Sequence, residues 1–257
     1  GISEYVGARE NAAITFSDNT ISGRCLFVID AKNADAYILS NKAGELYLID
    51  AKDKGISVTE LVTVDKTRPS IELNLDKVEA ELLPGSEKNQ GVINKILDAG
   101  RLMLSADSIG ASQIMLDKAV AYSLERKQFG RVIGSFQAVK HMCAEMAAEL
   151  EPCHSMIWHA AHCYDHDPAQ ARLMACHTKA HVSEVAKQIS KTSTEVHGGM
   201  GFTDELGLHY WFKRIGLNRQ LLGSPELVRE EAARIQNFDQ SPAEGQGNKE
   251  VGNPLLV

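Results

Sequence analysis

The chain has 257 residues, of which 44% are hydrophobic, enough to form one large core or two smaller ones. Its formal net charge of -7 and its pI of about 5.7 argue against a nucleic-acid surface and against a basic membrane-binding face. No apolar run approaches the length of a membrane span, and no charged-then-apolar leader follows Gly1. The five cysteines, most of them on helix-like segments, are typical of reduced thiols in a cytoplasm.

The first third of the sequence consists of short β-branched or alternating segments that are separated by turn residues. This pattern predicts strands over Ala12–Phe16, Ile21–Ile29, Ala36–Ser40, Glu45–Asp50, Ile56–Leu61 and Ser70–Leu75. Because no long helix lies between these segments, an antiparallel sandwich or small barrel is favoured over a parallel nucleotide-binding sheet.

The sequence changes character near Pro84-Gly85-Ser86, where we predict a boundary between a strand domain (1–85) and a helical domain (86–240). Helical spacing and capping residues predict helices over Val92–Lys127, Ser135–Asp165, Pro168–His197, Leu208–Arg219 and Glu226–Ile235. Long helices joined by short loops form an antiparallel four-helix-type bundle, so the expected class is α+β. The Gly-, Glu-, Asn- and Gln-rich tail (241–257) is expected to be disordered.

The connection between the first two predicted helices carries an unusual tetrad, Arg126, Lys127, Gln128 and Phe129. A cationic fork and an aromatic ring in a tight turn suit an anionic, ring-bearing ligand such as a nucleotide diphosphate. Taken alone, the tetrad is more typical of a solvated basic turn with one core Phe.

A second motif, Glu195-Val196-His197-Gly198-Gly199-Met200-Gly201-Phe202, places three glycines at a helix end, where backbone can approach a ligand closely. No strand precedes it and no helix begins on it, so it is not a nucleotide-binding fingerprint.

A cluster of histidines and cysteines follows on the second and third predicted helices. Several of these side chains share one helix face, which makes a metal site geometrically possible. No spacing such as H-E-x-x-H accompanies them, and we predict no metal site. The cluster comprises Cys153, His154, His159, His162, Cys163, His166, His177 and His181.

Three segments together resemble the signature of acyl-CoA dehydrogenases, and they occur in the expected order and spacing. They are Arg126–Gly130 with Ile133–His141, then Val196–Thr203, then Leu208–Arg214. The chain is most similar to the bacterial branch that acts on bulky acyl-CoA thioesters, including steroid side-chain fragments. The resemblance covers nearly the whole chain, as a middle β-domain and a C-terminal helical domain, without the family's N-terminal helical domain.

The resemblance implies FAD as the cofactor and an acyl-CoA as the substrate. It assigns contacts with the ADP portion of FAD, made across a subunit boundary, to Arg126, Gln128 and Phe129. The backbone of Gly198 and Gly199 would approach the same cofactor. Glu195 stands where the family usually has Gln, and a carboxylate beside a pyrophosphate is unfavourable unless it points away.

The flavin ring of the family is covered by a Trp-Ile-Thr/Ser strand, which corresponds here to Phe27-Val28-Ile29. Phe27 would stack on the ring, whereas Ile29 has no hydroxyl to offer the flavin.

The family removes an α-proton with a carboxylate base while a β-hydride leaves for the flavin. The resemblance aligns the two alternative base positions with Leu222 and Gly100 in this sequence, and neither residue accepts a proton. Asp98 and Asp107 are weaker substitutes, because a displaced base loses the geometry of proton transfer.

We therefore hypothesise that the chain is a subunit of a heteromeric acyl-CoA dehydrogenase that completes the FAD site of a catalytic partner. An alternative is a self-sufficient homotetrameric dehydrogenase with Asp98 or Asp107 as the base. A third is a flavin-free scaffold or metal-binding helical protein. By resemblance, an electron-transfer flavoprotein is the expected electron acceptor.

Overall fold

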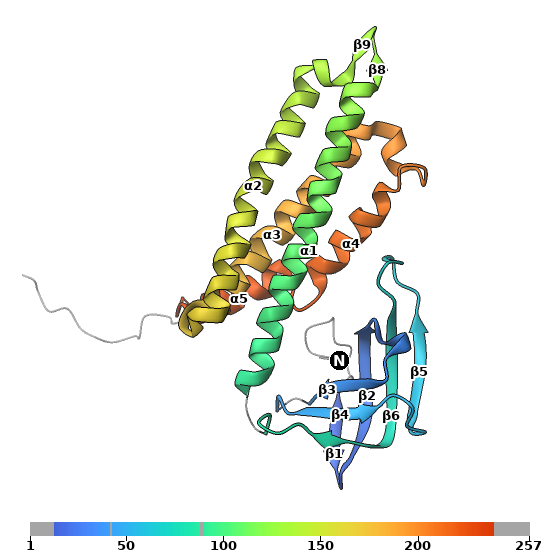
Figure 1. Cartoon of the computed structure of the whole chain (residues 1–257), viewed down its shortest axis with the longest axis vertical. Helices are drawn as coiled ribbons and strands as arrows, with labels where there is room; N and C mark the ends of the chain where they lie inside the picture. The colour runs from blue at the N-terminus through green and yellow to red at the C-terminus, as the bar shows by residue number, and fades with distance from the viewer. Residues whose placement is uncertain (1–12, 42, 88–89, 239–257) are drawn as a thin grey trace, which may run out of the picture.

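The computed structural model describes residues 13–41, 43–87 and 90–238 as a strand domain followed by a bundle of long helices (Figure 1). The last strand of the first domain ends at Leu82, and the first helix begins at Gln90. The predicted α+β class is confirmed, while the predicted disordered tail lies outside the described residues.

Two antiparallel sheets form the strand domain. The four-stranded sheet has the order β1-β2-β6-β5, and the three-stranded sheet has the order β3-β4-β7. Alternating apolar residues of both sheets, including Ile21, Leu39, Tyr47, Ile71 and Leu73, form one buried core between them. The strands are β1 (Ile14–Ser17), β2 (Thr20–Ile29), β3 (Ala36–Ser40), β4 (Leu46–Asp50), β5 (Ile56–Leu61), β6 (Ser70–Glu79) and β7 (Glu81–Leu82).

The pairing of β2 with β6 shifts register between Cys25 and Val28. Phe27 lies in this irregularity with a positive φ of 51°. Such a bulge re-aims the side chains around it, and it lies next to the cavity described below.

Five helices form the second domain: α1 (Gln90–Glu125), α2 (Gln137–His166), α3 (Pro168–His197), α4 (Leu208–Gln220) and α5 (Pro225–Ile235). The predicted helices are confirmed, with ends that differ by one or two residues. Their shared core includes Met115, Leu150, Val182 and Ile189, each at most 2% exposed.

The connection between α1 and α2 differs from the prediction. α1 ends at Glu125 because the chain enters a small hairpin of β8 (Lys127–Gln128) and β9 (Arg131–Val132). The predicted helix start at Ser135 is wrong: Ser135 closes a 3-10 turn, and its hydroxyl donates to the carbonyl of Val132 at 2.7 Å.

Two helix ends follow the predicted chemistry. Asp167 caps α3 by accepting a hydrogen bond from the backbone N–H of Ala169 at 3.2 Å, and Pro168 occupies the first turn. At the other end of α3, Gly198 stops the helix with a φ of 60° and leads into the 3-10 helix η4 (Gly198–Phe202). Within the described residues, no helix combines the length and apolarity needed to cross a membrane.

Candidate functional site

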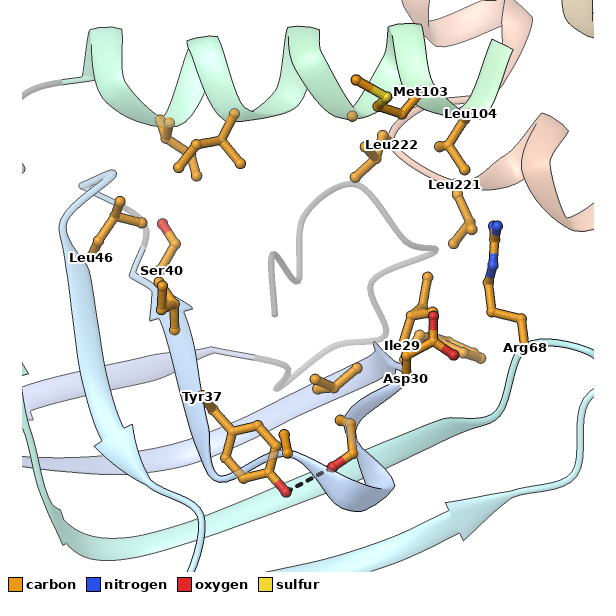
Figure 2. Close-up of a pocket in the computed structure, with 18 of the residues that line it drawn as sticks. Ile29, Asp30, Tyr37, Ser40, Leu46, Arg68, Met103, Leu104, Leu221 and Leu222 are labelled. Atoms are coloured by element: carbon orange, nitrogen blue, oxygen red, sulfur yellow. Dashed lines mark hydrogen bonds between the residues drawn. The ribbon is translucent and has the colours of Figure 1, made fainter. Parts of the chain in front are cut away.

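A cavity of about 760 Å³ lies between the strand domain, the first half of α1 and the connection from α4 to α5 (Figure 2). Its size suits a small organic ligand or the ring of a cofactor. Most of its wall is apolar, and its polar members are few. The apolar wall includes Phe27, Val28, Ile29, Tyr37, Ile38, Leu46, Ile93, Ile96, Met103, Leu104, Leu221 and Leu222.

The strand that we expected to cover a flavin forms one side of this cavity. Phe27 and Ile29 both line it, as the end of β2 passes beneath α1. The Ile29 side chain carries no hydrogen-bonding group, so this wall offers a ligand apolar contact and no hydroxyl donor.

The two residues aligned with the base positions meet in the cavity wall. A Cβ atom built on Gly100 would lie 2.3 Å from Cδ1 of Leu222, so the leucine side chain packs directly against the backbone of α1. Leu222 has a positive φ of 57°, and its carbonyl accepts a hydrogen bond from Nε of Arg101 at 3.0 Å. The structure thus brings both positions together and fills the space between them with hydrocarbon.

Asp98 does not line the cavity. Its carboxylate is buried and lies 3.5 Å from Arg101 and 3.4 Å from Arg172, in a cluster that also contains Glu231. Burial is the largest influence on the pKa of Asp98 and raises it above the ordinary value, although both arginines oppose the effect. This ion-pair cluster connects α1, α3 and α5.

Asp107 does line the cavity, but hydrogen bonds hold its carboxylate. Arg214 donates through Nε at 2.8 Å and through Nη2 at 2.9 Å, and Asn218 adds a further donor. Burial raises the pKa of Asp107, but the hydrogen bonds from Arg214 and Asn218 outweigh it and lower the pKa overall. A carboxylate held in this way is a poor proton acceptor.

The β8–β9 hairpin forms an exposed tip at the far end of the bundle from the strand domain (Figure 1). Arg126 and Gln128 are exposed, and the Phe129 ring is 92% exposed. Phe129 has a φ of 53°, and Arg131 holds its guanidinium 3.9 Å from the centre of the Phe136 ring. An exposed aromatic ring among cations is suited to an external ligand.

The glycine motif lies at the same end of the bundle. The His197 ring is 4.6 Å from the ring of Tyr122, which places the end of α3 beside the last turns of α1. A Cβ atom built on Gly198 or Gly199 would meet nothing within 4 Å, so this backbone faces open space. Glu195 is also exposed. The structure therefore places the predicted contacts of the ADP portion at one end of the molecule.

This tip and the cavity of the same chain are far apart. At 1.5 Å per residue, α1 carries the chain about 39 Å from Gly100 to Arg126. One dinucleotide does not bridge that distance. A dinucleotide that contacts the tip therefore does not also reach this cavity of the same chain.

Nothing in the sequence indicated that Arg68 and Asn218 meet Asp107 at the end of the cavity. Arg68 donates to Asn218 at 2.7 Å and lies 3.6 Å from Asp107, which is also bound by Arg214. These residues come from the β5–β6 connection, α1 and α4. Since they are far apart in the sequence, only the fold reveals that they belong together.

The histidine and cysteine cluster forms a few pairs. Cys163 lies 3.7 Å from His159, and the rings of His162 and His166 are 4.8 Å apart. In the part of the chain that the structure describes, no three metal-ligating side chains are grouped as a metal site requires. All five cysteines are free thiols.

A model of the family "Acyl-CoA dehydrogenase, C-terminal domain" matches residues 89–236. The chain is similar to the caffeyl-CoA reductase-Etf complex subunit CarC of Acetobacterium woodii, with 30% identity over 220 residues that cover 80% of this chain and 58% of CarC. It is also similar to the acyl-CoA dehydrogenase IpdE2 of Mycolicibacterium smegmatis, with 30% identity over 169 residues that cover 66% of this chain and 51% of IpdE2.

Solved structures share the fold. A variant of the Tcur3481-Tcur3483 steroid ACAD superposes with a TM-score of 0.79 and 23% identity, and the match covers 93% of this chain and 67% of that chain. The chain spans only half to three fifths of the length of the two curated relatives named above.

Proposed function

Because the chain belongs to the acyl-CoA dehydrogenase family, we propose that it is a subunit of an FAD-dependent acyl-CoA dehydrogenase and lacks a catalytic base of its own. Its bundle tip completes the FAD site of a partner subunit. The observation that carries this proposal is the contact between Gly100 and Leu222, which fills both aligned base positions with hydrocarbon.

The remaining carboxylates do not replace the missing base. Asp98 lies outside the cavity in its ion-pair cluster. Asp107 lies about 10 Å from Gly100 along α1, and Arg214 and Asn218 keep it ionised and bonded. Proton transfer requires a base within hydrogen-bond reach of the proton, so neither aspartate is placed for the family's reaction.

FAD is the cofactor of this family and, when bound, supplies the acceptor for a hydride. The ADP end fits the tip, where Arg126, Gln128 and Phe129 are exposed and the backbone of Gly198 and Gly199 faces open space. The ring end fits the cavity less well, since Ile29 replaces a hydroxyl donor. The chain thus retains the residues for the ADP end, which contact a neighbour's cofactor, better than the residues for the flavin ring in its own cavity.

The assembly follows from this division. The distance along α1 supports a second acyl-CoA dehydrogenase subunit as the partner of the tip, and this subunit contributes the base and the ring pocket. The relative CarC is named as a subunit of an Etf complex, which supports a multi-subunit setting and an electron-transfer flavoprotein as the electron acceptor. Membership of the family supports an acyl thioester as the class of substrate, which reacts in the pocket of the partner subunit.

Co-expression with a candidate partner subunit, followed by visible spectroscopy of the purified protein, tests the proposal. We expect little flavin absorbance for this chain alone and stoichiometric FAD in the complex. Arg126→Ala should reduce the FAD content of the complex, whereas the exposed α5 variant Arg229→Ala should not. Stoichiometric flavin in the chain alone would overturn the half-site proposal, and absence of flavin with every partner would favour a flavin-free scaffold.

One observation favours a second candidate, a self-sufficient homotetrameric dehydrogenase: Asp107 is a carboxylate on the cavity wall. This candidate predicts yellow protein and activity without a partner, both measured on the chain alone. Asp107→Asn would then abolish turnover while leaving FAD bound. Under the half-site proposal, the same substitution leaves the activity of the complex unchanged.

A further inference from the structure

We propose that Arg68 forms the polar end of the cavity and binds a neutral carbonyl oxygen at the far end of an apolar ligand. The inference goes beyond the proposed function, in which the acyl group reacts in the pocket of the partner subunit, and concerns a ligand held in this chain's own cavity. It rests on the place of Arg68, its unused donors and the charges beside it.

The position of Arg68 makes it a wall residue and not a surface cation. It lies in the connection between β5 and β6, and its side chain rises into the cavity beside Leu221 (Figure 2). The side chain is only 13% exposed. A guanidinium that is buried to this degree interacts strongly with groups in the cavity, because water screens it weakly.

Arg68 retains hydrogen-bond donors. Its Nη1 donates to Oδ1 of Asn218 at 2.7 Å, and its Nη2 is 3.6 Å from Oδ2 of Asp107. Arg214 donates to the same Asp107 oxygen at 2.8 Å, so that carboxylate is bonded more closely to another arginine. A guanidinium carries five N–H donors, and the described residues use at most two of those of Arg68.

Other polar groups in the cavity wall do not compete for an acceptor oxygen. The Tyr37 hydroxyl donates to the carbonyl of Ala31 at 3.1 Å, and the Ser40 hydroxyl donates to the carbonyl of Asn41 at 3.0 Å. Each hydroxyl has one proton to donate, and that proton is already engaged in the hydrogen bond to the backbone. Among the described side chains of the wall, Arg68 is therefore the donor available to a carbonyl.

Neighbouring charges favour a neutral oxygen over an anionic one. Asp107 and Asp30 both line the same end of the cavity, and the backbone N–H of Asp30 donates to the carbonyl of Pro69, which follows Arg68. Asp107 and Asp30 offset the charges of Arg68 and Arg214, so this end of the cavity has no excess positive charge to compensate for the dehydration of a carboxylate. A ketone accepts a hydrogen bond without losing the hydration of a charge.

The length of the ligand follows from α1. Arg68 contacts Asp107, which lies about 10 Å along the helix from Gly100, where the Leu222 side chain packs against α1. Between these points the wall is formed by Met103, Leu104 and Leu221. The ligand therefore has an apolar body about 10 Å long that ends in a carbonyl.

Ligand-observed NMR with the flavin-free full chain tests this inference, with 4-cyclohexylcyclohexanone, bicyclohexyl and 4-cyclohexylcyclohexanecarboxylate as probes. We expect the ketone to bind about tenfold more tightly than either of the other two. Arg68→Met should reduce the ketone to the affinity of bicyclohexyl, while Arg229→Met on the exposed face of α5 should change nothing. If circular dichroism shows that Arg68→Met is unfolded, Arg68→Gln takes its place and should lose most of the preference.

Equal affinity for the ketone and bicyclohexyl would overturn the proposal, as would a preference that survives both Arg68 variants. Tightest binding of the carboxylate would overturn the assignment of a neutral oxygen, and no binding of any probe would overturn the site. None of these results depends on a partner subunit or on FAD, so the co-expression experiment stays an independent test of the proposed function.

Discussion

Gly100 and Leu222, which are 122 positions apart, share one small volume at the interface between α1 and the α4–α5 connection. The leucine Cδ1 atom lies 2.3 Å from where a Cβ atom on residue 100 would be, so any larger residue there collides with it. A larger residue at position 100 therefore requires the Leu222 side chain to move or change rotamer. The two positions are coupled through this contact.

Gly100→Ala should be less stable than Gly110→Ala by about 1 kcal/mol, because the new methyl group at position 100 displaces the Leu222 side chain while both changes gain helix propensity. In Leu222→Ala the same change should cost little, since the clash is gone. Urea unfolding of both single variants and the double variant gives the coupling energy. Gly110→Ala is the matched control: it lies on the same helix with nothing within 4 Å of its added Cβ atom. Additive effects of Gly100→Ala and Leu222→Ala would contradict the contact.

The sequence predicted the elements better than the site. Alternation and capping located the strands and helices, because the relevant interactions are local in the chain. The cavity end could not be predicted in this way, since Arg68, Asp107 and Asn218 meet only through the packing of the strand domain on α1 and α4. The predicted substitute base Asp98 shows the same limit: it lies two positions before the cavity residue Gly100, and the rotation of about 200° between them turns its side chain into a buried ion pair.

Phe129→Ala and Arg126→Ala should leave the free energy of unfolding within about 0.5 kcal/mol of the original value, because both side chains are exposed at the tip. In the proposed complex, the same variants should weaken FAD retention, since stacking and charge-assisted bonds to the cofactor are lost. Urea unfolding of the free chain and the flavin content of the complex separate these two effects. A large loss of stability in the free chain would instead indicate a structural role for the tip.

Arg101→Met should destabilise the chain by about 3–5 kcal/mol. The Arg101 side chain is 1% exposed, lies near the carboxylates of Asp98 and Glu231, and donates to the carbonyl of Leu222. Its removal leaves buried negative charge with less compensation and frees the strained Leu222 backbone. Thermal unfolding measures the loss, and Arg234→Met on exposed α5 is the control. Equal melting temperatures for these two variants would contradict the account.

Lys179 should make stability rise with pH above neutrality. Its side chain is buried on α3, where its Nζ donates to the carbonyls of Asn218 and Arg219 at the end of α4. Burial, followed by repulsion from Arg101 and Arg219, lowers the pKa of Lys179 to about 7. From there up to the ordinary lysine pKa, the unfolded chain binds a proton that the folded chain has lost, so the free energy of unfolding increases with pH.

Urea unfolding between pH 7 and pH 8.5 isolates this contribution when the chain is compared with Lys179→Met, which should lack the increase. Burial raises the pKa of Cys153 and Cys176, which makes the free energy of unfolding fall with pH, equally in both chains. The contribution of Lys179 is therefore the difference in the free energy of unfolding between the two chains. Below pH 7 the lysine is charged in both the folded and the unfolded state, so the two curves should run parallel there. The exposed Lys140→Met variant should follow the original chain throughout. A pH dependence that is identical in Lys179→Met would show that this lysine stays charged when buried, with the α4 carbonyls as sufficient partners.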